Sequence, residues 1–490
     1  MTYHLRLPLL LAAIAALSGC GGDSAPTLPI AVIGQPSDPF ASGIRLPVAG
    51  QLARAATAEG LVSFDAEGRV VPALADRWIV TDDGLSYIFR LRDGRWSEGI
   101  ALTGESGREA LNQALVSLHG TALGEDLSVI EDVRAMAGRV VEIRLRHPMP
   151  ELLDLLAQPE LALLHKDRGT GPTTAKRDGA VDLLRPLPPE RLGLAQPEDW
   201  AASVRPARLV ALSAAEAVQS FRDGKSEVVL GGTMADYALA LGAAGLSRSA
   251  LRIDPVSGLF GLLVTGTNGP LATPEAREAL AMAIDRDALA TDLGIATWQP
   301  TTRVVPAATP DAPATIGERW IGWDMARRRT EAANRLSRAG VKPGRKTVLR
   351  IALPRGPGAD ALFNLIHADL GAIGITVARV DVGAPAELRL FDAVARYPRV
   401  DWYFNQFACA AGRDPCSVLA DSKAEQARDA SDSAKRSALL EDAEAALTLS
   451  NIYIPLGAPV RWSLVRGQLS GFAPNPRGWH PLTPLIIRQN

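Results

Sequence analysis

The front part of the chain alternates short apolar runs with turn residues. The runs cover residues 61–64, 78–80 and 87–91, and a turn sequence ending in glycine follows each of them. Such spacing is typical of a β-meander. The periodicity becomes helical over 105–118 and strand-like over 140–145. We therefore expect a small α+β unit in this region.

The middle of the chain has strand–helix–strand patterns. Strand-like runs at 209–212 and 227–230 flank a helical pattern at 214–222, and a second unit of this kind covers 347–382. Such βαβ units predict parallel sheets.

Other helices are marked by their boundary residues. The helix predicted over 273–289 starts with a Thr-Pro pair, and the one predicted over 324–339 is followed by glycine. Residues 151–164 also have a helical pattern. Residues 166–191 are rich in Gly, Pro and charge, which predicts a loop.

Composition indicates an ordinary globular protein. Of its 490 residues, 47% are apolar and 22% are charged, and a chain of this length is expected to form two to four compact units. The net charge is -2, from 52 basic and 54 acidic side chains spread along the chain. No basic patch for nucleic acid is predicted.

The first residues differ from the rest. His4 and Arg6 precede an apolar run over 7–17 that ends in Ser18, Gly19 and Cys20. This pattern predicts a signal peptide over 1–19, too short to remain as a membrane span.

The cysteine at the cleavage point resembles the lipobox of bacterial lipoproteins. The resemblance implies that Cys20 is lipidated, that residues 20–26 form a tether, and that the protein is anchored to a membrane in the periplasm or at the cell surface. An ordinary signal peptide with an incidental cysteine is the alternative.

Motifs for catalysis or metal binding are missing from the sequence. The six histidines are scattered without an HExxH pair, and neither a Walker A loop nor a Gly-x-Ser-x-Gly elbow occurs. The Gly-Thr-Gly at 169–171 lacks the third glycine of a dinucleotide fingerprint. We expect no enzyme, no cofactor and no metal.

Long stretches of the chain resemble a known family. Residues 60–106 read GLVSFDAEGRVVPALADRWIVTDDGLSYIFRLRDGRWSEGIALTGES, residues 221–232 read FRDGKSEVVLGG, and residues 270–289 read PLATPEAREALAMAIDRDAL. In this order they resemble the extracellular solute-binding proteins of family 5, which include dipeptide-, oligopeptide- and nickel-binding proteins.

This resemblance implies an α/β fold with two lobes, of the class II periplasmic-binding-protein type, and an additional small α+β domain. A small solute, possibly a peptide, would be trapped between the lobes by hinge closure and passed to ABC permease subunits by a monomeric receptor. The implied bounds are 27–59, 165–265 and 468–490 for lobe I, 60–164 for domain II, and 266–467 for lobe III.

One segment departs from the family pattern. Peptide binders of the family carry an aspartate that holds the amino terminus of the peptide, and in DWYFNQFACAAGRDPCS at 401–417 its place falls on Ala410 or Ala411. Without it, a buried ammonium loses a charge-assisted hydrogen bond of about 1.5–3 kcal/mol. We expect a modified or capped peptide or another solute, unless Asp414 substitutes.

The same segment supplies the candidate ligand contacts, which are Trp402, Asn405, Gln406, Arg413 and Asp414. A strand is predicted at 402–404, with its first and third side chains on one face. These aromatic residues either fill the core or form a stacking wall. Arg413 either contacts the ligand or is a solvated surface charge.

Two cysteines remain besides Cys20. Cys409 and Cys416 lie in an exported chain, and Gly412 and Pro415 between them suit a tight turn. We predict a disulfide between them.

A second function stays open, that of a non-transporting periplasmic scaffold or sensor partner with the same fold. The missing aspartate and the short segment at 165–210 favour this alternative.

Overall fold

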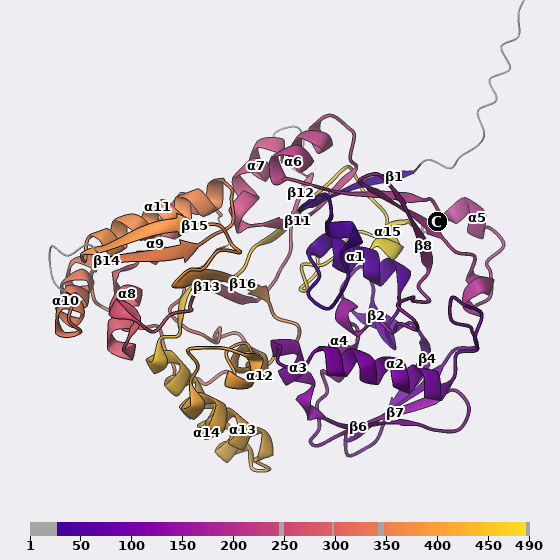
Figure 1. The fold of residues 1–490 in the computed structure, drawn as a ribbon, viewed down its shortest axis with the longest axis horizontal. Coiled ribbons are helices and arrows are strands. Elements are labelled where there is room, and N and C mark those ends of the chain that lie inside the picture. The colour runs from indigo at the N-terminus through magenta and orange to yellow at the C-terminus, as the bar shows by residue number, and fades with distance from the viewer. Residues whose placement is uncertain (1–26, 245–248, 296–297, 342–346, 487–490) are drawn as a thin grey trace, which may run out of the picture.

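A computed structural model describes residues 27–244, 249–295, 298–341 and 347–486. Cys20 and the predicted signal peptide lie outside the described residues. The described chain forms a seven-, a five- and a four-stranded sheet and a two-stranded ribbon. In Figure 1 the five-stranded sheet lies on the left, and the other sheets lie on the right.

The seven-stranded sheet has the order β12-β18-β11-β1-β10-β9-β8. Its strands are β1 (Leu28–Ile33), β8 (Thr173–Asp178), β9 (Val181–Pro186), β10 (Ala207–Leu212), β11 (Val228–Thr233), β12 (Leu251–Ile253) and β18 (Arg461–Val465). The helices beside it are α1 (Val48–Thr57), α5 (Trp200–Ser203), α6 (Ala214–Arg222), α7 (Tyr237–Ala244) and α15 (Leu482–Ile486).

Strand β1 shows why this sheet is covered on both faces. Leu28, Ile30 and Val32 pack with residues of α1 and α15, whereas Ala31 packs with residues of α6, because successive side chains of a strand point to opposite faces. The predicted βαβ unit β10–α6–β11 is confirmed as parallel, with β1 paired between its two strands.

The predicted loop at 166–191 is wrong. Strands β8 and β9 form an antiparallel hairpin within it that extends the sheet beyond β10. Five of the six residues of β8 are exposed, so this edge strand has no apolar alternation to reveal it. Its pairing rests on backbone hydrogen bonds, which do not require apolar side chains.

The five-stranded sheet has the order β15-β14-β16-β13-β17. Its strands are β13 (Gly258–Val264), β14 (Thr347–Ala352), β15 (Ile375–Val380), β16 (Leu388–Val394) and β17 (Tyr453–Gly457). Its helices are α8 (Pro274–Ala283), α9 (Arg286–Leu293), α10 (Met325–Arg338), α11 (Pro357–Gly371), α12 (Val400–Asn405), α13 (Val418–Asp429) and α14 (Ser433–Ser450). Parallel pairing of β14 with β15 around α11 is confirmed.

The helix predicted over 273–289 is instead two helices, α8 and α9. Thr273 caps α8 as predicted, but Ile284 is extended and Asp285 caps the next helix by accepting a hydrogen bond from the Ala288 N–H. The Asp285 N–H is itself bonded to Asp369. An aspartate that satisfies the free amides of a new helix favours a break at its own position.

The four-stranded sheet contains the second and third of the predicted meander strands, whereas the first, at 61–64, lies in a separate ribbon. The sheet has the order β4-β5-β7-β6, with β4 (Ala75–Val80), β5 (Ser86–Leu91), β6 (Ile130–Ala135) and β7 (Val140–Leu145). Beside it lie α2 (Gly104–Ser117), α3 (Ala122–Asp126) and α4 (Leu152–Leu156), while β2 (Val62–Phe64) and β3 (Val70–Pro72) form the separate ribbon. Helix α4 is shorter than the predicted 151–164, because Pro159 cannot continue an α-helix.

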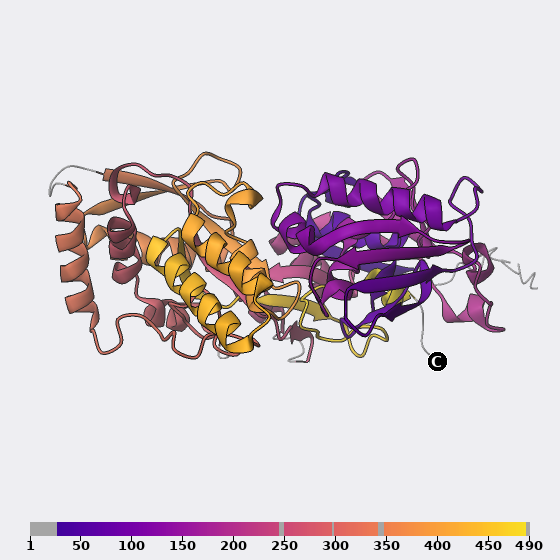
Figure 2. The ribbon, with the colours of Figure 1, turned by 90° about the horizontal axis from the view of Figure 1, so that it is seen from below.

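The chain crosses between the seven- and five-stranded sheets twice. One crossing, at residues 254–257, joins β12 to β13, and the other, at 458–460, joins β17 to β18. Figure 2 shows the two halves side by side with strands passing between them.

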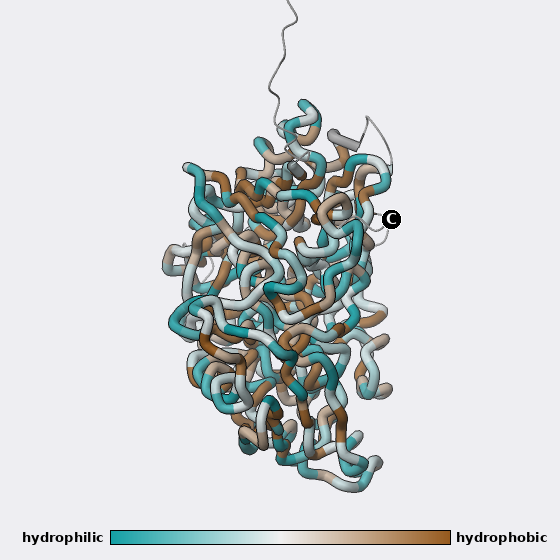
Figure 3. The backbone as a smooth tube through the Cα atoms, turned by 90° about the vertical axis from the view of Figure 1, so that its right-hand side faces the viewer, coloured by the Kyte–Doolittle hydropathy of each residue, from teal (hydrophilic) through white to brown (hydrophobic). Residues whose placement is uncertain are grey.

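Hydrophobic and hydrophilic stretches alternate in short lengths along the tube in Figure 3. Among the described helices, none is long and apolar enough to cross a membrane.

Candidate functional site

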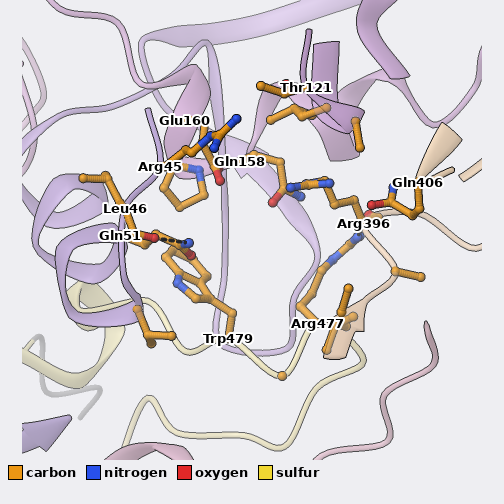
Figure 4. A pocket seen from close by; sticks show the side chains of 18 of the residues that line it. Arg45, Leu46, Gln51, Thr121, Gln158, Glu160, Arg396, Gln406, Arg477 and Trp479 are labelled. Carbon is orange, nitrogen blue, oxygen red and sulfur yellow. Dashed lines mark hydrogen bonds between the residues drawn. The ribbon is translucent and has the colours of Figure 1, made fainter. Parts of the chain in front are cut away.

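A cavity of about 590 Å³ lies between elements of the seven-stranded half, the five-stranded half and the segments beside the four-stranded sheet (Figure 4). Its wall includes residues before and within α1, the 118–123 turn, the end of β16, α12 with the loop after it, and residues 477–479. Segments far apart in the sequence therefore share one hollow of a size suited to a small solute.

Helix α12 replaces the strand predicted at 402–404. Trp402, Tyr403 and Phe404 are all buried, so the predicted division into two faces is wrong. When every side chain of a short segment is buried, apolar periodicity does not separate a helix from a strand. Trp402 packs edge-on against Tyr403 and also lines the cavity, so it belongs to both the core and the cavity wall.

Three of the five candidate ligand contacts come together at the cavity, namely Trp402, Gln406 and Arg413. The Gln406 amide donates to the Trp402 carbonyl over 3.2 Å, and the Arg413 Nε donates to the Gln406 carbonyl over 2.8 Å. The Arg413 guanidinium lies 5.2 Å from the centre of the Phe391 ring. Burial lowers the pKa of Arg413, and the charge of nearby Arg45 lowers it further.

Asn405 and Asp414 do not line this cavity. Asn405 is buried, and its Nδ2 donates to Asp126 of α3 over 2.9 Å, as does the Tyr397 hydroxyl over 2.9 Å. This cluster joins α12 to α3. Asp414 is exposed beside Pro415, so its carboxylate does not take the place of the missing aspartate.

The residues at the expected aspartate position are Ala410, which is exposed, and Ala411, which lines the cavity. No carboxylate of the described segment 401–417 lines the cavity with it. Cys409 and Cys416 form a disulfide that closes the loop carrying Ala411 and Arg413. The Cys409 N–H also donates to Asp421 over 2.8 Å, which ties this loop to α13.

Sequence reasoning missed four further arginines of the cavity wall, which are Arg45, Arg396, Arg461 and Arg477. They come from four separate segments of a chain with 52 basic residues. No local spacing marks them, and only the fold brings them together.

Arg477 contacts three parts of the molecule. It donates to the Gly68 carbonyl over 3.1 Å, to Asp154 over 2.5 Å and to the Arg396 carbonyl over 2.5 Å. Its guanidinium also lies 4.5 Å from the centre of the Phe64 ring. Arg477 therefore ties the C-terminal segment to the turn between β2 and β3, to α4 and to the five-stranded half.

A family model described as bacterial extracellular solute-binding proteins, family 5, middle region, matches residues 69–384. The chain belongs to this family. The family consists of solute-binding proteins rather than enzymes, which confirms both the predicted family and the expectation that this protein is not an enzyme.

The proteins that resemble this chain in sequence are named for different ligands. The chain is 25% identical over 479 residues to di/tripeptide-binding protein 2 of Pseudomonas aeruginosa, covering 83% of this chain and 84% of that one. It is 23% identical over 312 residues to the periplasmic oligopeptide-binding protein OppA of Salmonella typhimurium, covering 58% of this chain and 57% of that one. It is also 34% identical over 125 residues to a probable deoxycholate-binding periplasmic protein of Escherichia coli, a match that covers 21% of this chain and 23% of that one.

Solved structures share the fold at lower identity. OppA of Haemophilus influenzae in complex with RPPGFSPFR has a TM-score of 0.80 at 17% identity, covering 94% of this chain and 99% of that one. The murein tripeptide binding protein MppA of Escherichia coli also has a TM-score of 0.80 at 17% identity, with 95% and 99% covered. The predicted two-lobed fold is confirmed.

Proposed function

We propose that this family 5 protein captures a small peptide-like solute in the cavity by lobe closure and delivers it to an ABC importer. The observation that carries the proposal is the cavity itself, which is lined from all three sheet regions. Closure around such a site removes water from the ligand and pairs its polar groups, while opening lets it enter and leave.

The lobes of this proposal follow the sheets. Strand β13 pairs in the five-stranded sheet and β18 pairs in the seven-stranded sheet. We therefore place the limits of lobe III at the crossings 254–257 and 458–460 instead of at 266 and 467, and keep 60–164 as domain II. The crossings are the natural hinge, because only these two connections link the two large sheets in the described chain.

The ligand of this proposal lacks a free ammonium at the wall formed by 401–417. Ala411 lines the cavity where a carboxylate is expected, and Asp414 points its charge to solvent outside it. Blocked or modified peptides suit this wall, since they bring no ammonium that would need a carboxylate there.

Native mass spectrometry of protein purified without denaturation tests the proposal. A bound solute should add a mass that disappears on denaturation, and at 100 times its Kd the same solute should stabilise the fold by about 2.7 kcal/mol. A protein that carries no solute, and that no blocked peptide, dipeptide or sugar stabilises, would instead support the non-transporting scaffold.

The membrane anchor has its own test. We propose that Cys20 is lipidated, so Cys20→Ser should move the protein from the membrane fraction to the soluble fraction. Joint replacement of Cys409 and Cys416 by Ser serves as the control, because it removes the other two cysteines with their disulfide but leaves Cys20. An unchanged distribution of the Cys20→Ser protein would contradict lipidation.

A further inference from the structure

Arginines dominate the charges of the cavity wall. Arg45, Arg396, Arg413, Arg461 and Arg477 line it, and the acidic residues of the wall are Glu160 and Asp392. An ion pair of 2.8 Å joins Arg461 to Asp392, and one of 2.5 Å joins Arg477 to Asp154, which lies outside the wall. The charge of Glu160 acts on the half-buried Arg54.

Three guanidinium groups of the cavity wall have N–H donors that form no hydrogen bond within the described chain. Within the described chain, the side chains of Arg45 and Arg396 form neither a hydrogen bond nor an ion pair within 4.0 Å, and Arg413 bonds only through its Nε. Figure 4 shows Arg45 and Arg396 on different sides of the cavity, with Arg396 extending toward Gln158. A guanidinium carries five N–H donors, so these three can still bind several acceptor oxygens.

The charges of Arg45 and Arg413 also act on each other. The pKa of Arg413 is lowered by burial and then by Arg45, so two like charges of the cavity wall act on each other. An anion placed between the two guanidiniums would relieve this repulsion and gain charge-assisted hydrogen bonds from both.

We propose that the solute is an anion with carboxylate groups held by Arg45, Arg396 and Arg413. This inference rests on the proposed solute-binding function and names the ligand class. It agrees with the Ala411 position, because a site without a carboxylate for an ammonium, and with three guanidiniums that form no ion pair within 4.0 Å, favours an acidic, N-blocked ligand over an ordinary dipeptide.

The first experiment identifies the solute that is retained on purification, by native and then tandem mass spectrometry. We expect an acidic solute whose occupancy falls in Arg45→Gln and in Arg413→Gln. The matched control is Arg355→Gln, since Arg355 is 86% exposed and lies outside the cavity wall. This control should retain the solute.

The second experiment uses a defined pair of probes, N-acetyl-Glu-Glu and its uncharged counterpart N-acetyl-Gln-Gln-amide, in a thermal-shift titration. Only the acidic probe should stabilise the protein. Each arginine substitution should weaken its binding about 10- to 100-fold, and Arg413→Lys should weaken it less than Arg413→Gln because the charge remains.

The outcomes separate the two proposals. A retained solute that is neutral or cationic, or stabilisation by the uncharged probe equal to that by the acidic one, overturns the anion inference and leaves solute binding intact. An acidic solute that both arginine variants retain at full occupancy overturns the assignment to these residues. The absence of any retained or stabilising solute overturns solute binding itself, and the anion inference with it.

Discussion

Two arginine-rich regions of this molecule differ in how their charges are satisfied. In the five-stranded half, Glu278 of α8 lies between Arg319 and Arg335 and pairs with both, at 2.7 Å from Arg319. Arg319 also donates to Asn451 over 2.7 Å, and its guanidinium lies 4.4 Å from the Trp320 ring centre. We call these residues the Glu278 cluster.

At the cavity, by contrast, the side chains of Arg45 and Arg396 form no hydrogen bond or ion pair within 4.0 Å in the described chain, and Arg413 donates one hydrogen bond, to the Gln406 carbonyl. The charge of Arg396 acts only from a distance, on the buried Asp126. The comparison teaches that the number of arginines does not identify a binding site. Satisfied guanidiniums of the Glu278 cluster stabilise the fold, whereas those of the cavity keep their donors for another molecule. Substitutions in the two regions should therefore affect different measurements.

Substitution of Asp126 should give the largest change in stability. It extends the comparison to a carboxylate near the cavity arginines. Asp126 is the buried carboxylate on which Arg396 acts, and burial raises its pKa to about 7 from 3.8. Because the pKa of Asp126 is higher in the folded protein than in the unfolded chain, the protonated carboxyl favours the folded state. This contribution to the free energy of unfolding is complete below pH 3.8 and is lost as the pH rises toward and through 7.

Asp126→Asn should remove this loss, since an amide keeps the acceptor for Tyr397 and Asn405 without a buried charge. At pH 8 the variant should be more stable than the parent by about 4 kcal/mol, and at pH 4 the two should be nearly equal. Urea unfolding at both pH values measures the difference. A parallel pH dependence in the two proteins would show that Asp126 does not titrate in this way.

Breaking the Glu278 cluster should give the next largest effect. Glu278→Gln leaves the mostly buried Arg319 without its carboxylate, which should cost about 3 kcal/mol of unfolding free energy. The affinity of the remaining protein for its solute should be unchanged, because this cluster does not line the cavity. Urea unfolding and a solute titration should be run on the same preparation, with Asp381→Asn as control, because its pair with Arg355 is exposed and lies outside the cluster.

The disulfide belongs to the cavity side of the comparison. Replacing Cys409 and Cys416 together with Ala should cost about 2.5 kcal/mol in the chain-entropy model for a loop of this size. It should also weaken solute binding, because the loop that carries Arg413 loses its constraint. Thiol titration of the denatured, unreduced parent should find neither cysteine reactive, and two free thiols would contradict the pairing.

Arg45→Gln should have the smallest effect on the unliganded protein. It removes an exposed side chain without an ion pair and relieves repulsion with Arg413, so the unfolding free energy should change by less than about 0.5 kcal/mol. Solute affinity should nevertheless fall. A large loss of stability in urea without solute would place Arg45 among the structural arginines and break the comparison.

Much of the fold could be predicted because its elements carry local signals. The meander strands β4 and β5, the βαβ units, the Thr273 cap of α8 and the helix α10 all lie where alternation, turns and boundary residues placed them. The hairpin β8–β9 was missed since an exposed edge strand lacks alternation, and α12 was read as a strand since all of it is buried.

The site was predicted only in part. The segment at 401–417 pointed to Trp402, Gln406 and Arg413, because these are neighbours in sequence. Asn405 was assigned to the ligand but bonds Asp126 instead, which depends on how α3 packs against α12. The arginines at 45, 396, 461 and 477 depend on contacts between distant segments, and no pattern within one sequence reports such contacts.

The three-way contact of Arg477 bears on how fast the proposed receptor exchanges its solute. Its bonds to Gly68 and Asp154 stay within one side of the proposed hinge, whereas the bond to the Arg396 carbonyl crosses to lobe III and must break on opening. Every kcal/mol held in such crossing bonds lowers the population of open molecules about fivefold. Since solute enters and leaves through the open form, the same bond that keeps the cavity closed slows both capture and release.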